Sequence, residues 1–318
     1  LDNTIGLNGT HVAFAIADFA NSYNAQLTAN FGQKSFTYTP PTGFVALQQD
    51  NLPETAKGVS GLVWIKSRDT ASAHMLFDSS RGAQLRLKSD STSSETTSQG
   101  TVTKFLKGGY AVGDQTSVNK SGDSVVAWNW VANGGTTASN SNGSITSVVQ
   151  ANQTAGFSIV QYTGTGSAGT VGHGLSKKLD WVMVKSRSND TGDGFGIYHS
   201  GMTSASYYLA LNSTNEERNA SVVWNGTAPT SSVFSIGTAT GTNTSSATYI
   251  AYCWHGVEGF SKFSSYSANN NTDGTFVYTG FKPAFVMVKN IDSAYSWFMF
   301  DNKRDTFNPV SHFLSADQ

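Results

Sequence analysis

Short apolar runs separated by turn residues recur along the whole chain, and hardly any stretch has the spacing of an amphipathic helix. The runs are rich in Val, Ile, Phe, Tyr and Trp, and clusters of Gly, Asn and Ser separate them about every ten residues. Asn-Gly pairs at 133–134 and 225–226 supply the positive backbone angles that tight turns require. The pattern predicts an all-β protein.

Several runs are apolar at every position instead of at alternate positions, for example 181–184. A strand of this kind needs cover on both faces, so we expect these runs to be central strands. Lys66, Lys185 and Lys289 each end such a run, and we expect each lysine to emerge where its strand leaves the core.

The runs recur in a fixed order, which indicates tandem copies of one module of about a hundred residues. One block occurs three times, two further blocks follow it each time, and the closing strand of the first copy recurs in the second. The matching segments are 62–68, 181–187 and 285–291; 75–78, 196–199 and 298–301; 84–90, 208–213 and 312–317; and 125–130 with 249–254.

These matches predict antiparallel β-sandwich modules in tandem. Residues 136–154 are rich in Ser, Thr and Asn and are predicted to be a linker. Because the chain starts at Leu1 and ends at Gln318 in mid-pattern, we expect both ends to continue in a longer polypeptide. The predicted modules are a short one at 58–135, a full one at 155–258 and a truncated one at 259–318, with residues 1–57 standing apart.

Composition narrows the classes of function. Charged residues make up only 13% of the chain, and 20 Lys and Arg nearly balance 21 Asp and Glu, so we expect no binding to nucleic acid. No apolar run approaches the roughly 18 residues of a membrane span, so we expect no membrane insertion. A single cysteine excludes an intrachain disulfide framework and a multi-cysteine zinc site. Stability should therefore come from packing or from association with other subunits.

Two segments carry a resemblance to known proteins. Residues 27–33 (LTANFGQ), with 36–44 and Leu47, resemble the closing strands of a SPRY (B30.2-like) domain as found in phage virion proteins. The rest is similar to the uncharacterised repeats that follow such domains in tail fibre and structural proteins of tailed, often marine, phages. The motifs that carry this second resemblance lie at 162–166, 171–175, 279–289 and 301–305.

The resemblance implies a β-sandwich fold, a location on the virion and a role in binding the host surface. Its implied partners are other copies of this chain, other virion proteins, and a glycan or protein of the host. It supplies no catalytic residues and no cofactor.

Two turns place a carboxylate three residues before a guanidinium: Asp78 with Arg81, and Asp301 with Arg304. Across a turn, this spacing allows a charge-assisted hydrogen bond that fixes the loop after a strand. The alternative is a saccharide contact in which both groups bind vicinal hydroxyls, so the four residues are also candidate ligand contacts.

Trp224 and Asn225 are a further candidate ligand site, because the sequence Trp-Asn-Gly-Thr predicts a turn. A large ring at the tip of a turn is suited to stack on a sugar or on a partner subunit. The other tryptophans that fall in repeated strands are predicted to be core: Trp64, Trp128, Trp181 and Trp254.

Catalytic and metal sites are weakly indicated. Cys253 and His255 would share one face of a strand, but the matching strand of the first module has Asn129 and Val131 there. We therefore expect a buried thiol and no nucleophile.

The loop 189–194, with Asp190 and Asp193, has the oxygen-rich composition of a calcium loop, as does 269–274. Neither has the bidentate glutamate of an EF-hand, and hairpin turns explain both. The few glutamates suggest no acid pair for glycoside cleavage.

We therefore expect a structural and adhesive virion protein, a tail fibre segment, with no enzymatic activity. A capsid or tail decoration protein is a close alternative. A secreted carbohydrate-binding or polysaccharide-degrading protein and a subunit of an extracellular cellular filament are the others.

Overall fold

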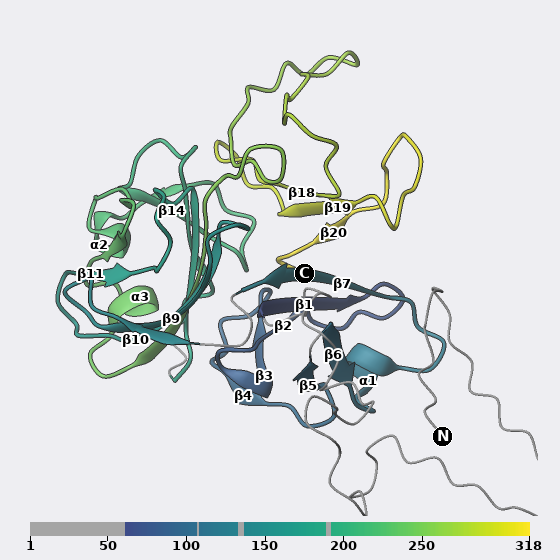
Figure 1. The fold of residues 1–318 in the computed structure, drawn as a ribbon. Coiled ribbons are helices and arrows are strands. Elements are labelled where there is room, and N and C mark those ends of the chain that lie inside the picture. Colours follow the sequence, from purple (N-terminus) through teal and green to yellow (C-terminus); the bar gives the residue numbers. More distant parts are fainter. Residues whose placement is uncertain (1–60, 107, 133–136, 189–191) are drawn as a thin grey trace, which may run out of the picture. The chain divides into compact units, whose positions relative to one another are not determined.

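The computed structural model describes residues 61–106, 108–132, 137–188 and 192–318 (Figure 1). The predicted SPRY-like end at 1–57 lies outside the described residues. All described residues belong to one compact unit, 52–318. Its regular secondary structure is almost entirely antiparallel strand, which confirms the all-β prediction. No helix among the described residues is long and apolar enough to cross a membrane.

The first module contains a five-stranded antiparallel sheet. A hairpin of β5 (Val102–Leu106) and β6 (Gly109–Val112) and the single-turn helix α1 (Thr116–Asn119) contribute to the core on one face. In order across the sheet, the strands are β4 (Thr96–Thr97), β3 (Gly82–Lys88), β2 (Met75–Asp78), β1 (Gly61–Ser67) and β7 (Val125–Val131).

Strand β1 is buried at all seven positions, as its continuous apolar run predicts. Val63 and Ile65 pack in the small core under the β5–β6 hairpin. Leu62 and Trp64, which point to the opposite face, belong to the large core that extends through the other modules. The strand is therefore covered on both sides.

The second module contains an eight-stranded antiparallel sheet. A two-stranded sheet and two single-turn helices accompany it: β11 (Gly169–Gly172), β16 (Val233–Ile236), α2 (Ser221–Trp224) and α3 (Thr240–Asn243). In order, the large sheet has β15 (Arg218–Asn219), β14 (Tyr207–Ala210), β13 (Gly196–His199), β12 (Trp181–Ser186), β17 (Thr248–Trp254), β10 (Phe157–Thr163), β9 (Ser147–Asn152) and β8 (Ala138–Asn140).

The strand order repeats between the predicted modules. The order β7-β1-β2-β3-β4 in the first sheet recurs as β17-β12-β13-β14-β15 in the second. The third module repeats the β1-β2-β3 part with β18 (Phe285–Val288), β19 (Phe298–Asp301) and β20 (Leu314–Ser315).

The prediction of a linker at 136–154 is wrong for its described part. Strands β8 and β9 lie there, and β9 pairs with β10 over six positions. Ser147 and Val149 are buried on one face of β9, with Val148 exposed between them. Serine and threonine fit a half-buried strand as well as they fit a loop, so their abundance does not identify a linker.

Two of the three lysines that end the apolar runs, Lys66 and Lys185, do not emerge from the core as predicted, whereas Lys289 is partly exposed. Lys185 is only 1% exposed, and its ammonium donates to the carbonyl of Ser91 at 2.7 Å. Lys66 is buried too and donates to the carbonyl of Ser72. Burial lowers the pKa of Lys66, although Asp90 acts in the opposite direction. Carbonyl oxygens replace water as partners of these ammonium groups.

Candidate functional site

Asp78 and Arg81 form a buried ion pair at the turn after β2, with no exposed side-chain surface on either residue. One carboxylate oxygen of Asp78 accepts hydrogen bonds from the backbone N–H groups of Ser80 and Arg81, at 3.0 and 2.8 Å. The other accepts from Nε of Arg81. The predicted charge-assisted turn is confirmed, and its burial leaves it no access to a saccharide.

The pair belongs to a network that joins the first module to the second. Nη1 of Arg81 donates to Glu95 at 2.9 Å, and Glu95 also accepts from Nη2 of Arg187 in the second module at 2.9 Å. The hydroxyl of Tyr252, on β17, donates to Asp78 at 2.7 Å. Two carboxylates and two guanidinium groups balance in charge, which limits the cost of burying them.

The network shifts the ionisation of its members. Burial alone would lower the pKa of Arg81, but Asp78, Tyr252 and Glu95 together raise it above its ordinary value. Burial also raises the pKa of Tyr252 well above 10. Arg81 therefore stays charged and Tyr252 stays a neutral hydrogen-bond donor at every pH where the protein would be studied.

Asp301 and Arg304 repeat this arrangement in the third module. Asp301 accepts from the backbone N–H groups of Lys303 and Arg304, at 3.0 and 2.9 Å, and from Nε of Arg304 at 2.7 Å. Its second oxygen also accepts from the indole Nε1 of Trp128, on β7 of the first module, at 3.2 Å. Burial opposes the shift, but the hydrogen bonds and charge of Arg304 lower the pKa of Asp301.

The two donors, Tyr252 and Trp128, occupy the same place in the two closing strands, since 249–254 matches 125–130. The carboxylate of the first module thus binds the closing strand of the second. The carboxylate of the third module binds the closing strand of the first. One type of contact is used at two junctions between modules.

Backbone hydrogen bonds follow the same order. The N–H of Glu95 in the first module donates to the carbonyl of Arg187 in the second, at 3.0 Å. The N–H of Glu217 in the second donates to the carbonyl of Ile291 in the third, at 3.0 Å. Arg187 and Ile291 are matching positions of the repeat. The contacts therefore run from first to second, second to third and third to first module.

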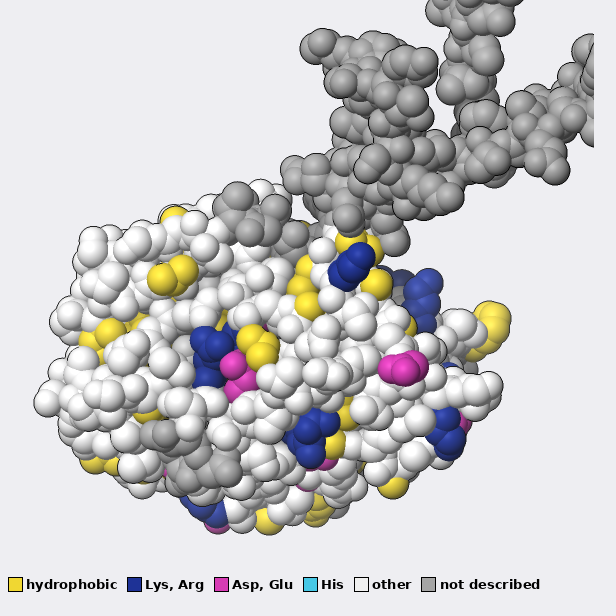
Figure 2. Space-filling model, turned by 90° about the horizontal axis from the view of Figure 1, so that it is seen from below, with side chains coloured by type: hydrophobic (Ala, Val, Ile, Leu, Met, Phe, Trp, Pro, Cys, Tyr) yellow, Lys and Arg dark blue, Asp and Glu magenta, His cyan; other side chains and the backbone are white. Residues whose placement is uncertain are grey.

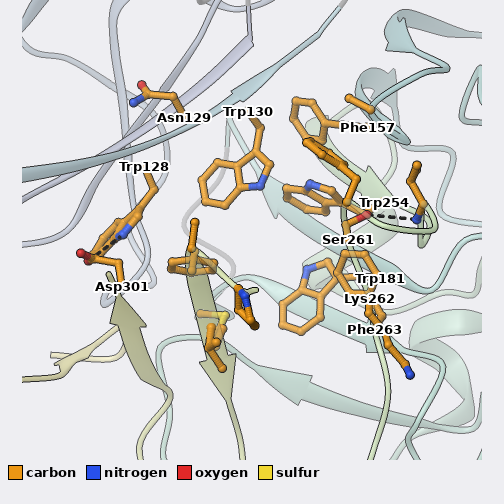
Figure 3. A pocket seen from close by; sticks show the side chains of 18 of the residues that line it. Trp128, Asn129, Trp130, Phe157, Trp181, Trp254, Ser261, Lys262, Phe263 and Asp301 are labelled. Carbon is orange, nitrogen blue, oxygen red and sulfur yellow. Dashed lines mark hydrogen bonds between the residues drawn. The ribbon is translucent and has the colours of Figure 1, made fainter. Parts of the chain in front are cut away.

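A cleft of about 1650 Å³ lies between β7, β18 and the segment 257–284 (Figure 3). Trp130 and Trp254 stand near each other in its wall, with ring centroids 5.9 Å apart. The ring centroid of Phe285, on β18, lies 5.8 Å from that of Trp130. Other aromatic residues that line it are Trp64, Trp128, Phe157, Trp181, Phe260, Phe263, Tyr266 and Phe281.

The cleft is poorly equipped for acid–base chemistry. Among the described residues that line it, Asp301 is the one carboxylate, and it already accepts hydrogen bonds from Arg304 and Trp128. Cleavage of a glycoside needs two carboxyl groups facing each other across the substrate. The lining instead suits an apolar or aromatic ligand with a few polar contacts, from groups such as Asn129 and Lys262.

Trp224 is not exposed at a turn as predicted. It ends helix α2, is only 2% exposed and packs edge to face against Tyr198, with ring centroids 6.1 Å apart. Asn225 does adopt the positive backbone angle expected of an Asn-Gly turn, with φ of 52°. The turn thus comes directly after Trp224, whose ring points into the core and is not accessible to a sugar.

The thiol and the loops show no reactive arrangement. Cys253 is fully buried, and burial raises its pKa, which opposes formation of a nucleophilic thiolate. Asp190 lies outside the described residues, and the carboxylate of Asp193 accepts from the hydroxyl of Thr240 at 3.1 Å. Within the described ranges, no three His, Cys, Asp or Glu side chains converge as metal ligands.

Sequence reasoning missed the contributions of Glu95, Arg187, Tyr252 and Trp128 to the junctions. The repeat alignment contains a signal for two of them. Trp128 and Tyr252 align, and both side chains can donate one hydrogen bond from the end of an aromatic ring. Glu95 and Arg187 lie 92 positions apart, so no local pattern links them.

The chain belongs to a family described as Domain of unknown function (DUF7483), which matches residues 49–318. The match extends over all three modules, so the family unit contains the junctions as well as the sheets. No curated protein matches the chain. No solved structure matches it either.

Proposed function

We propose that this protein is a non-enzymatic structural and adhesive protein of a virion, a segment of a phage tail fibre that contributes to host attachment. The observation that carries the proposal is the use of one module and one junction contact in succession. Tandem copies of one module that pack on one another are the signature of repeat architectures, which mainly supply structure and binding surfaces.

The chemistry of the described residues supports a structural role. The Asp-Arg pairs that stand out in the sequence hold turns and module junctions. The one cysteine is buried. Among the described lining residues, the cleft has one carboxylate, Asp301, which already binds Arg304 and Trp128. The face drawn in Figure 2 is mostly uncharged polar side chains and backbone, with scattered charged groups. Such a surface suits contact with neutral partners better than with polyanions.

An adhesive role draws support from the third module. Among the described residues, ten of the fourteen exposed large hydrophobic residues fall in 260–313. Phe276 and Phe307 are the most exposed, at 86 and 85%. Aromatic side chains concentrated on one part of a surface commonly mark a site of interaction.

Antibodies raised against the purified chain test the proposal. They should label fibres on phage particles by electron microscopy and should reduce adsorption of the particles to host cells. Labelling without reduced adsorption would favour a decoration protein. Absence of labelling from particles would contradict the virion assignment.

The aromatic cleft favours a second candidate, a carbohydrate-binding protein of a secreted system. A screen of the purified chain against neutral polysaccharides would separate the two. Phe260→Ala and Tyr266→Ala should abolish binding if the cleft holds a sugar. Tyr295→Ala is the matched control, since Tyr295 is 55% exposed and lies outside the cleft lining. Release of reducing sugar would refute the non-enzymatic assignment.

A further inference from the structure

The contacts between modules are of three kinds, and the junction between the first and second modules has all three. The turn carboxylate of the first module accepts from Tyr252 in the closing strand of the second. The backbone N–H of Glu95 donates to the carbonyl of Arg187. The ammonium of Lys185 donates to the carbonyl of Ser91, in the loop after the third strand of the first module, at 2.7 Å. The three contacts therefore belong to one interface.

The junction between the second and third modules repeats two of these contacts. The backbone N–H of Glu217 donates to the carbonyl of Ile291. The ammonium of Lys289, which matches Lys185, donates to the carbonyl of Thr214 at 3.1 Å. Thr214 lies in the loop after the third strand of its module, as the acceptor in the first module does. The second module is thus related to the third as the first is to the second.

The junction between the third and first modules repeats the remaining contact. Asp301 accepts from Trp128, which occupies the place of Tyr252 in its closing strand. One relation therefore takes the first module to the second, the second to the third and the third back to the first. A head-to-tail relation that returns to its starting point after three equal steps is a rotation by a third of a turn, which closes a ring.

Matching residues also meet at the centre of this arrangement, as a rotation axis requires. Trp130 and Trp254 occupy the same place in the two closing strands, and their ring centroids lie 5.9 Å apart (Figure 3). Trp64, Met183 and Met287 occupy the same place in β1, β12 and β18, and all three line the aromatic cleft. Matching residues come together in this way only near the axis that relates them, so the packing supports the ring independently of the hydrogen bonds.

We infer that the three modules form a closed ring of approximate threefold symmetry, in which the third-to-first junction is a latch that keeps the other two junctions closed. In an open row of modules, each junction opens alone. In a ring of three, no junction can open while the other two stay closed. Release of the latch should therefore let the first-to-second and second-to-third junctions open singly. The ring stands whether or not the protein belongs to a virion.

Trp128 is the residue through which the latch can be released. Its indole Nε1 donates to Asp301 at 3.2 Å. Its ring centroid lies 5.6 Å from that of Phe285 and 5.8 Å from the guanidinium carbon of Arg304. The hydrogen bonds and ring contacts described for Trp128 all lie in the first and third modules. Loss of its donor therefore acts directly on the latch and only indirectly on the other two junctions.

Hydrogen exchange of the full chain, followed residue by residue, tests the latch. The reporters are the amides of Glu95 and Glu217, each of which donates across a junction that Trp128 does not touch. Trp128→Phe removes the donor, and both amides should exchange about tenfold faster, since one junction instead of two must then open.

Trp128→Tyr is the matched control. It also reduces the size of the ring, but Tyr252 shows that a tyrosine hydroxyl can donate to the matching carboxylate, that of Asp78. Both reporter amides should therefore exchange within about threefold of their rates in the unmodified chain.

A second pair of variants acts on the other partner of the latch. Asp301→Asn removes the charge that Arg304 and Trp128 bind, and it should accelerate exchange at both reporter amides. Asp305→Asn is its control, because Asp305 lies close by in the chain but pairs with the exposed His312 and with no other module. It should leave the exchange of Glu95 and Glu217 unchanged.

Three results would overturn the inference. Acceleration confined to amides of β7 and β19 would show that the junctions open separately. Equal acceleration in Trp128→Phe and Trp128→Tyr would remove the hydrogen bond as the basis of the latch. An equal increase at the amides of the β10–β17 pairing, inside the second module, would show that the variants unfold the whole unit instead of opening the ring.

Discussion

Removal of the Asp78 carboxylate should destabilise the protein more than any surface change. In Asp78→Ala, the guanidinium of Arg81 would remain buried with only Glu95 as a charged partner. Breaking a buried ion pair on one side costs about 3–5 kcal/mol, since the remaining charge is left uncompensated. The hydroxyl of Tyr252 also loses its acceptor at the junction. We expect the unfolding free energy to fall by about 4 kcal/mol, or roughly 10 °C in Tm.

Urea unfolding followed by tryptophan fluorescence measures the loss. The double variant Asp78→Ala/Arg81→Met should recover part of it, because replacing both partners by uncharged residues costs less than orphaning one. Glu258→Ala, at an exposed position, should change the free energy of unfolding by less than about 0.5 kcal/mol. A loss below about 1 kcal/mol in Asp78→Ala, or a double variant less stable than the single, would refute this account of the network.

Two other changes have definite expected results. Burial lowers the pKa of His74 to about 3, so the unfolded chain binds more protons between that pH and about 6.5. Stability should be full above pH 6.5 and fall by about 2 kcal/mol at pH 5 through this group, a loss that His74→Gln should reduce in urea titrations at the two pH values. Trp224→Ala should cost about 3–5 kcal/mol in the same assay, because the ring is buried in the second module.

Local features of this fold could be predicted because they depend on neighbouring residues. Continuous apolar runs require cover on both faces, and β1 has it. The spacing of Asp78 and Arg81 allows contact across one turn, and the contact forms. The first three repeated blocks became neighbouring strands in their sequence order, since sequential strands connected by short turns pair with one another, whereas the closing strand pairs with the first.

The wrong predictions were those made from residue types alone, which do not show which way a side chain points. The Ser, Thr and Asn content of 136–154 does not separate a loop from a half-buried strand such as β9. The Trp-Asn-Gly sequence predicted the positive angle of Asn225 but could not tell which way the preceding ring points. In both cases the deciding term is burial against residues distant in the chain, here β10 and Tyr198.

The junctions explain why the second module departs from the others at the turn after its second strand. Asp78 and Asp301 are each held by a donor from the next closing strand, so their identity is constrained by a residue more than 170 positions away. His199 has no such donor among the described residues and instead accepts from Gly201. His199 therefore lacks, among the described residues, the aromatic donor that accompanies aspartate at the other two turns.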